Sequence, residues 1–194
     1  MFRPAHGGER LVNGGAVIAH GRVSLYEVRG DLQLYVDLVQ PEGVGELHLE
    51  LERLKVKLEA EGLFQVSRKR PIPLFPQRIG VVTSPFGSVW HDIQSIIARR
   101  YPLVELALAP TPVQGDGAAP GIVEALEVLN RQEDIDVVIL ARGGGSLEEL
   151  WPFNEESVAR AIYASRAPVI SAVGHETDYT IADMVADCRA PTPS

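Results

Sequence analysis

From residue 78 onward, short apolar segments alternate with longer segments of helical periodicity, and this alternation constrains the fold more than any other feature. Strands buried on both faces read as nearly continuous apolar runs, and parallel strands are usually joined by a helix. The pattern therefore predicts an α/β domain with a parallel sheet of about four strands and helices on both faces. The expected strands are 79–83, 104–109, 137–141 and 169–173; the expected helices are 88–100, 117–130, 155–165 and, after a short turn at 147–150, one near 179–188.

Polar residues follow each expected strand at the point where it ends. In open α/β sheets, whether flavodoxin-like or Rossmann-like, ligands bind outside the carboxyl ends of the strands. Right-handed crossovers bring these ends to one edge of the sheet. The sequence therefore predicts that one crevice collects the segments Thr83-Ser84-Pro85, Gln114-Gly115, Arg142-Gly143-Gly144-Gly145-Ser146 and Gly174-His175-Glu176-Thr177-Asp178.

The N-terminal residues have the pattern of β structure. Segments 16–27 and 32–40 flank the turn sequence at 28–31, which indicates a hairpin. In the second segment leucine and valine alternate with polar residues, as in a sheet with one solvated face. Because a two-stranded hairpin is marginal in water, either residues 1–15 add a strand or the chain begins inside a larger β domain.

An amphipathic helix and a proline-rich segment follow the hairpin. Leucines recur on one helical face, at Leu47, Leu51, Leu54 and Leu58. Gly62 is suited to end this helix. The prolines in 68–76 remove backbone donors and restrict their neighbours, so this segment is expected to be a linker. The expected domains are a β domain at 1–42, the helix and linker at 43–77, and the α/β domain at 78–194.

Charge and cysteine content restrict the class of protein. A net charge of −8 argues against nucleic-acid binding, although Arg68-Lys69-Arg70 and Arg99-Arg100 form basic clusters that are either binding or merely solvated. The single cysteine, Cys188, excludes an intramolecular disulfide and a multi-cysteine zinc site, and is expected as a small apolar residue near a helix end. No apolar stretch approaches the roughly 20 residues that cross a bilayer, so a cytoplasmic protein is expected.

The glycine run after the third strand has the features of a phosphate-binding loop. Residues without Cβ let backbone N–H groups approach an anion, and Arg142 offers a bidentate guanidinium. The lysine of the P-loop and the glycine spacing of dinucleotide sites are absent. The alternative is a tight turn between strand and helix. The residues expected to bind phosphate are Ser84, Gly143, Gly144, Gly145 and Ser146.

Ionisable groups near the strand ends suggest either acid/base or metal chemistry. His175 can act as acid or base near neutral pH, and Asp178 could orient it, while Glu176 can face away. Asp92 lies in the expected helix 88–100 and is either simply exposed or leans over the crevice. Asp92 and Asp178 could instead hold a divalent cation such as Mg²⁺, and the spacing leaves both roles open.

Ordered motifs along nearly the whole chain carry a family resemblance. They are Thr83-Ser84-Pro85 with Asp92-Ile93, Arg99-Arg100-Tyr101-Pro102, Val113-Gln114-Gly115, Arg142-Gly143-Gly144-Gly145-Ser146, Trp151-Pro152-Phe153-Asn154-Glu155, Gly174-His175-Glu176-Thr177-Asp178, and Ala186-Asp187 with Arg189-Ala190-Pro191-Thr192-Pro193-Ser194. Together they resemble the large-subunit family of exodeoxyribonuclease VII. The resemblance implies an exonuclease that degrades single-stranded DNA to short oligonucleotides, with catalytic roles for Asp92, Arg142, His175 and Asp178 and no obligatory divalent metal.

The resemblance also implies a domain order and partners. Family members have an N-terminal OB-fold that binds single-stranded DNA, a central catalytic domain, and C-terminal helices that recruit a small subunit. This chain is expected to be a fragment with a partial OB-fold and without those helices, and therefore inactive or weak alone. Two alternatives stay open: a catalytically incompetent module that binds single-stranded DNA or nucleotides, and a dinucleotide-binding oxidoreductase or sensor, whose expected acidic residue is not evident.

Overall fold

In the computed structural model of the chain, the described residues are 17–26, 31–41, 44–175 and 179–193. Contacts divide the chain into two compact units, Met1–Arg53 and Leu54–Ser194. The three-part division at residues 42 and 77 stays a prediction. Within the described ranges, no helix combines the length and the apolar character needed to span a bilayer.

The first unit contains an antiparallel hairpin, in which β1 (Val17–Tyr26) pairs with β2 (Asp31–Pro41). The predicted hairpin is thereby confirmed, and residues 27–30 between its strands lie outside the described residues. Cross-strand pairs such as Val23 and Leu34 bring apolar side chains together, and both of these side chains are exposed. The hairpin therefore presents an apolar face.

The helix α1 (Val44–Ala60) ends where the sequence predicts. Gly62 has a φ of +83°, and its N–H donates to the carbonyl of Glu59 while the N–H of Leu63 donates to the carbonyl of Leu58. This pair of bonds is the Schellman motif, which favours glycine because a side chain is strained at positive φ. The side chain of Leu58 is fully buried, as expected for the apolar face of the helix.

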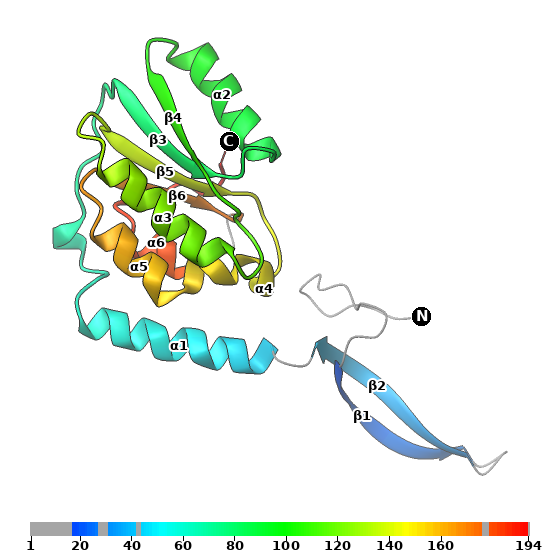
Figure 1. Ribbon diagram of the computed structural model, residues 1–194. Helices are drawn as coiled ribbons and strands as arrows, with labels where there is room; N and C mark the ends of the chain where they lie inside the picture. Colours follow the sequence, from blue (N-terminus) through cyan, green and yellow to red (C-terminus); the bar gives the residue numbers. More distant parts are fainter. Residues whose placement is uncertain (1–16, 27–30, 42–43, 176–178, 194) are drawn as a thin grey trace. The chain divides into compact units, whose positions relative to one another are not determined.

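The second unit is built on a parallel sheet, in which the described residues form five strands (Figure 1). In spatial order they are β4 (Glu105–Pro110), β3 (Arg78–Thr83), β5 (Val137–Arg142), β6 (Val169–Val173) and β7 (Cys188–Arg189). The α-helices are α2 (Ser88–Arg100), α3 (Ala118–Asn130), α4 (Leu147–Leu150), α5 (Glu156–Tyr163) and α6 (Ile181–Val185), and two 3₁₀ segments are η1 (Val66–Arg68) and η2 (Trp151–Asn154). The predicted α/β class with a parallel sheet is confirmed.

Helices cover both faces of this sheet because side chains alternate along each strand. Ile79 and Val81 of β3 belong to a core cluster with Ile93 of α2. Between them, Gly80 faces the other way, since a Cβ at this position would meet Leu129 of α3. The helices α2 and α3 therefore lie on opposite faces, and α5 packs beside α3 (Figure 1).

After β6 the chain differs from the prediction. The helix expected over 179–188 ends at Val185, and Cys188 starts β7, where it is exposed rather than a small apolar residue of the core. Asp187 explains the change, because its N–H donates to the carbonyl of Val169 and its carboxylate accepts the N–H of Val169. These bonds hold residues 187–189 beside β6, and β7 pairs with β6 as a fifth strand in addition to the four predicted ones.

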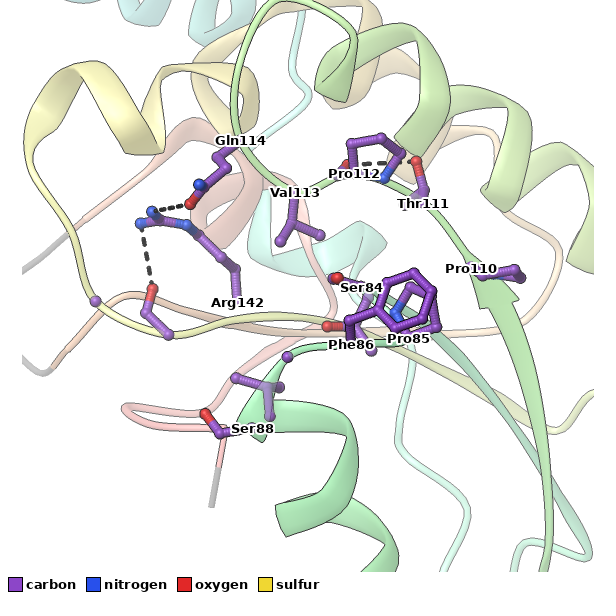
Figure 2. A pocket seen from close by; sticks show the side chains of 15 residues that line it. Ser84, Pro85, Phe86, Ser88, Pro110, Thr111, Pro112, Val113, Gln114 and Arg142 are labelled. Atoms are coloured by element: carbon purple, nitrogen blue, oxygen red, sulfur yellow. Dashed lines mark hydrogen bonds between the residues drawn. The ribbon is translucent and has the colours of Figure 1, made fainter.

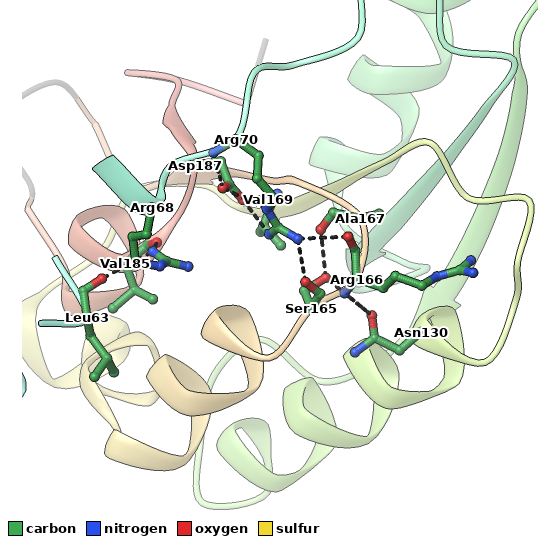
Figure 3. Close-up of polar contacts among 10 residues, drawn as sticks. All are labelled: Leu63, Arg68, Arg70, Asn130, Ser165, Arg166, Ala167, Val169, Val185 and Asp187. Atoms are coloured by element: carbon green, nitrogen blue, oxygen red, sulfur yellow. Dashed lines mark hydrogen bonds and ion pairs between the residues drawn. The ribbon is translucent and has the colours of Figure 1, made fainter. Parts of the chain in front are cut away.

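The basic segment at residues 68–70 is bound to the α/β unit rather than merely solvated (Figure 3). Arg70 donates to the carboxylate of Asp187 through its backbone N–H, Nε and Nη2, at 2.8, 3.0 and 2.7 Å. Its Nη1 donates to the carbonyls of Ser165 and Arg166. The Arg68 guanidinium likewise donates to two backbone carbonyls. Two of the three charges in this predicted cluster thus anchor the linker.

Candidate functional site

A cavity of about 680 Å³ lies at the carboxyl ends of β3, β4 and β5 (Figure 2). Of the residues predicted to bind phosphate, Ser84, Gly143 and Gly144 line it, together with Arg142. The chain leaves β3 toward α2 on one face of the sheet and leaves the adjacent β5 toward α5 on the other face, and a crevice opens where neighbouring strands are left in this way. Three of the four predicted strand ends therefore meet at this cavity.

Arg142, the last residue of β5, is held in place by three acceptors. Only 6% of the residue is exposed. Its Nη2 donates to Oε1 of Gln114 and to Oε2 of Glu149, both at 3.2 Å, and its Nη1 donates to the carbonyl of Gly143 at 3.3 Å. A guanidinium has five N–H donors, so these bonds fix its orientation and leave donors for a ligand.

Glu149 was not among the residues predicted for the site. It forms a capping box with Ser146 at the start of α4: the Ser146 hydroxyl accepts the N–H of Glu149, and Oε2 of Glu149 accepts the N–H of Ser146. The same carboxylate pairs with Arg142. The spacing Ser-x-x-Glu is the sequence signal that could have found it. The hydroxyl of Ser146, expected on phosphate, takes part in this cap.

Two glycines of the run, Gly144 and Gly145, are required by packing rather than by turn geometry. Among the described residues, glycines with positive φ are Gly62, Gly115 and Gly174, so the turn after β5 would accept other residues. A Cβ at Gly144, however, would overlap the imidazole of His175. A Cβ at Gly145 would overlap the guanidinium of Arg142 and the carboxylate of Glu149. This packing argues against a loop whose glycines serve only to turn the chain.

His175 therefore lies against the glycine run although it comes from the end of the next strand. Gly174, with a φ of +74°, turns the chain there, and its N–H donates to the carbonyl of Arg142 at 3.1 Å. The carbonyl of His175 accepts a bond from Nη2 of Arg189, whose guanidinium also stacks on the ring of Tyr179. His175 is exposed to solvent.

Three predicted residues, Asp92, Glu176 and Asp178, are not among the described residues that line the cavity. Asp92 is exposed on α2, one turn after Ser88, which lines the cavity; Asp92 itself does not line it. Asp178 and Glu176 lie outside the described residues. Within those residues, no three side chains of the His, Cys, Asp or Glu type are grouped closely enough to hold a metal ion.

Comparison with known proteins gives a consistent set of matches. Residues 63–194 match the family described as "Exonuclease VII, large subunit". The chain is 61% identical to the exodeoxyribonuclease 7 large subunit of Geobacillus kaustophilus over 185 residues, which cover 95% of this chain and 41% of that protein. It is 57% identical to the corresponding subunit of Bacillus cytotoxicus over 193 residues, which cover 100% and 41%. The chain thus spans less than half the length of these relatives.

Proposed function

This chain belongs to the exonuclease VII large-subunit family, and from that premise we propose that it carries the chemistry for exonucleolytic hydrolysis of single-stranded DNA to short oligonucleotides. The observation that carries the proposal is the meeting of Arg142, the glycine run and His175 at the ends of β5 and β6. A guanidinium and backbone N–H groups bind a phosphate, and an imidazole moves a proton. Phosphodiester hydrolysis needs both.

In the proposed reaction, water attacks the phosphorus and gives up a proton, the bond to the leaving oxygen breaks, and that oxygen takes up a proton. Arg142 and the N–H groups of the glycine run bind the non-bridging oxygens of the scissile phosphate. His175, oriented by Asp178, transfers the proton. Stabilisation of the charge that develops on the phosphate is the largest contribution, because such donors are aligned before the reaction starts.

Asp92 has two candidate roles in this scheme. It positions the attacking water, or it joins Asp178 as a ligand of a divalent metal. Two carboxylates suit Mg²⁺, which keeps several of its waters and would supply a Lewis acid for the phosphate. We favour catalysis by acid and base, with Asp92 positioning the water, over metal catalysis. The buried guanidinium of Arg142 already provides positive charge beside the glycine run.

The strand order supports one of the two predicted doubly wound folds. Numbered within the sheet, β4-β3-β5-β6-β7 reads 2-1-3-4-5, the flavodoxin-like order, whereas the Rossmann order begins 3-2-1. For the N-terminal residues 1–42 we propose the later part of an OB-fold. The exposed apolar side chains of the hairpin, among them Leu25 and Leu32, are typical of strands that belong to a larger β domain.

We propose that the complete protein acts in the cytoplasm on single-stranded DNA and assembles with a small subunit through C-terminal helices beyond the residues of this chain. The 194 residues alone are expected to be inactive or weak. They cover 41% of the length of two relatives that they match, and holding a single strand takes an extended basic groove and stacking surface.

Hydrolysis of labelled single-stranded DNA by the complete enzyme, with and without EDTA, tests the proposed function. We expect shortening from the ends to oligonucleotides and little change in rate with EDTA. Complete loss of activity with EDTA would favour the role of Asp92 and Asp178 as ligands of a divalent metal. Binding of DNA without cleavage would instead favour the alternative, a binding module without catalytic activity.

Gly144→Ala separates the catalytic role of the glycine run from its role in the fold. The added Cβ would overlap the His175 ring and displace it, and because His175 is exposed, this displacement disturbs no buried packing. A displacement of a catalytic group by about 1 Å can cost about 100-fold in rate, so we expect kcat to fall by up to that factor while the melting temperature stays nearly constant. Steady-state kinetics and thermal denaturation measure the two quantities.

Gly143→Ala is the matched control, because a Cβ at Gly143 would make only an ordinary contact with Val89, at 3.8 Å. Its φ is not positive, so alanine is also tolerated by the backbone. We expect nearly wild-type kcat for this variant. Equal loss of activity in both variants would show that the loop needs flexibility rather than a place for the imidazole.

A further inference from the structure

The cavity beside Arg142 is larger than a phosphate needs, and its far side is apolar. Pro85, Phe86, Pro110, Pro112 and Val113 supply this side, at the ends of β3 and β4. Its volume of about 680 Å³ falls within the range of roughly 300–1,000 Å³ that is usual for small-molecule sites. An anion bound at the glycine run would leave the apolar side unoccupied.

Phe86 is the most unusual residue of this apolar side. It is 94% exposed, although the same unit buries Phe153 completely. Figure 2 shows the Phe86 ring beside Pro85, in the segment between β3 and α2. Exposure of a whole aromatic ring costs free energy unless a ligand covers it, so a phenylalanine at the cavity indicates a partner with a flat, apolar surface.

We propose that this cavity holds the nucleobase of the nucleotide whose phosphate lies on the glycine run, and that the base stacks on Phe86. The inference rests on the proposed function and names the part of the DNA that the site recognises. Arg142, Gly143 and Gly144 line the same cavity as Phe86, so one nucleotide contacts both sides. Stacking accepts any base, because every base has a π-face.

Two of the polar groups that line the cavity are already engaged in hydrogen bonds within the protein. The hydroxyl of Thr111 already donates to the carbonyl of Pro112, and Oε1 of Gln114 already accepts from Arg142. Reading of a base edge requires hydrogen-bonding groups directed at it. Stacking on Phe86 therefore selects nucleotides that carry a base over abasic ones. It does not itself distinguish one base from another.

The test is the cleavage of oligothymidylate with and without one abasic residue beside the bond that is cut, by the complete enzyme with its small subunit. The wild-type enzyme is expected to cut the intact site about tenfold faster, in line with the contribution of one stacked base. Phe86→Ala should cut both substrates at the same slow rate, and Phe86→Trp should restore the preference. Phe75→Ala is the matched control, since Phe75 is 79% exposed and does not line the cavity.

The outcomes distinguish this inference from the function on which it rests. Failure of the wild-type enzyme to cut single-stranded DNA would overturn both. Cutting by the wild-type enzyme with no preference for the intact site, or with a preference that Phe86→Ala retains, would overturn the inference and leave the proposed function intact. A preference lost in Phe86→Ala and kept in Phe75→Ala would support it.

Discussion

We expect His175→Ala to lower the rate of single-stranded DNA hydrolysis by about 10²- to 10⁴-fold in the complete enzyme, the usual contribution of a positioned general acid or base, and to leave DNA binding nearly unchanged. The imidazole lies against Gly144, two residues after Arg142, so in the proposed function its loss would remove proton transfer and leave the groups that hold the phosphate in place. Single-turnover kinetics give the chemical rate, and fluorescence anisotropy at a fixed salt concentration gives the affinity.

His48→Ala is the control for this experiment. His48 is an exposed residue of α1 and does not line the cavity, so its removal tests the general effect of losing one histidine. We expect its hydrolysis rate to equal that of the wild-type enzyme. Weakened DNA binding with intact turnover in His175→Ala would contradict the catalytic role and would make His175 a binding residue.

We expect Asp187→Asn to lower the free energy of unfolding by up to about 3–5 kcal/mol, the cost of removing one partner from a fully buried ion pair, since the side chain of Arg70 is 31% exposed. The side chain of Asp187 has no exposed surface, and it accepts the N–H of Val169 in addition to three bonds from Arg70. An asparagine keeps the shape but turns an NH₂ group toward these donors and leaves the guanidinium without its counter-charge. Urea denaturation of wild type and variant measures the difference.

Glu127→Gln makes the same chemical change at the surface, where Glu127 pairs with Arg131 on α3. Exposed pairs of this kind contribute little, so we expect nearly unchanged stability. A similar effect at the two positions would show that the bonds around Asp187 are not specially important.

The pH dependence of stability provides a second reading of Asp187. Burial raises the pKa of this carboxyl, but hydrogen bonds from the side chain and N–H of Arg70 and from the N–H of Val169 outweigh burial, so the pKa lies below its ordinary value of 3.8. The stabilisation is complete above the unfolded pKa and is lost as the pH falls through the lower, folded pKa. Wild type should therefore lose this contribution only below about pH 4, whereas Asp187→Asn lacks it throughout.

The sequence predicts elements well where local signals and tertiary packing agree. Strands such as β6 are mostly apolar because the sheet is covered on both faces, and α1 ends at Ala60, just before Gly62, because glycine accepts the backbone that follows without strain. The end of α6 at Val185 was missed, since the bonds that redirect the chain come from Arg70 and Val169, which are far away in the sequence. Local periodicity carries no trace of such bonds.

The candidate site divides in the same way. The rule that ligands bind at strand ends predicts that Ser84 and Arg142 lie together, and both residues line the same cavity. The sequence does not predict Glu149 as a site residue. Its spacing from Ser146 indicates a capping box at a helix start, and a capping box carries no information about the ion pair between Glu149 and Arg142. The roles of Asp92 and Asp178 stay predictions, because the first does not line the cavity and the second lies outside the described residues.

The pair between Arg142 and Glu149 has a consequence for the enzyme between turnovers. A buried guanidinium without an anion is costly, and Glu149 supplies that anion while its own side chain remains 53% exposed. In the proposed function, the phosphate binds the donors that Arg142 has left, and Glu149 keeps its bonds to the start of α4. The guanidinium therefore has a counter-charge before the phosphate arrives and after the product leaves.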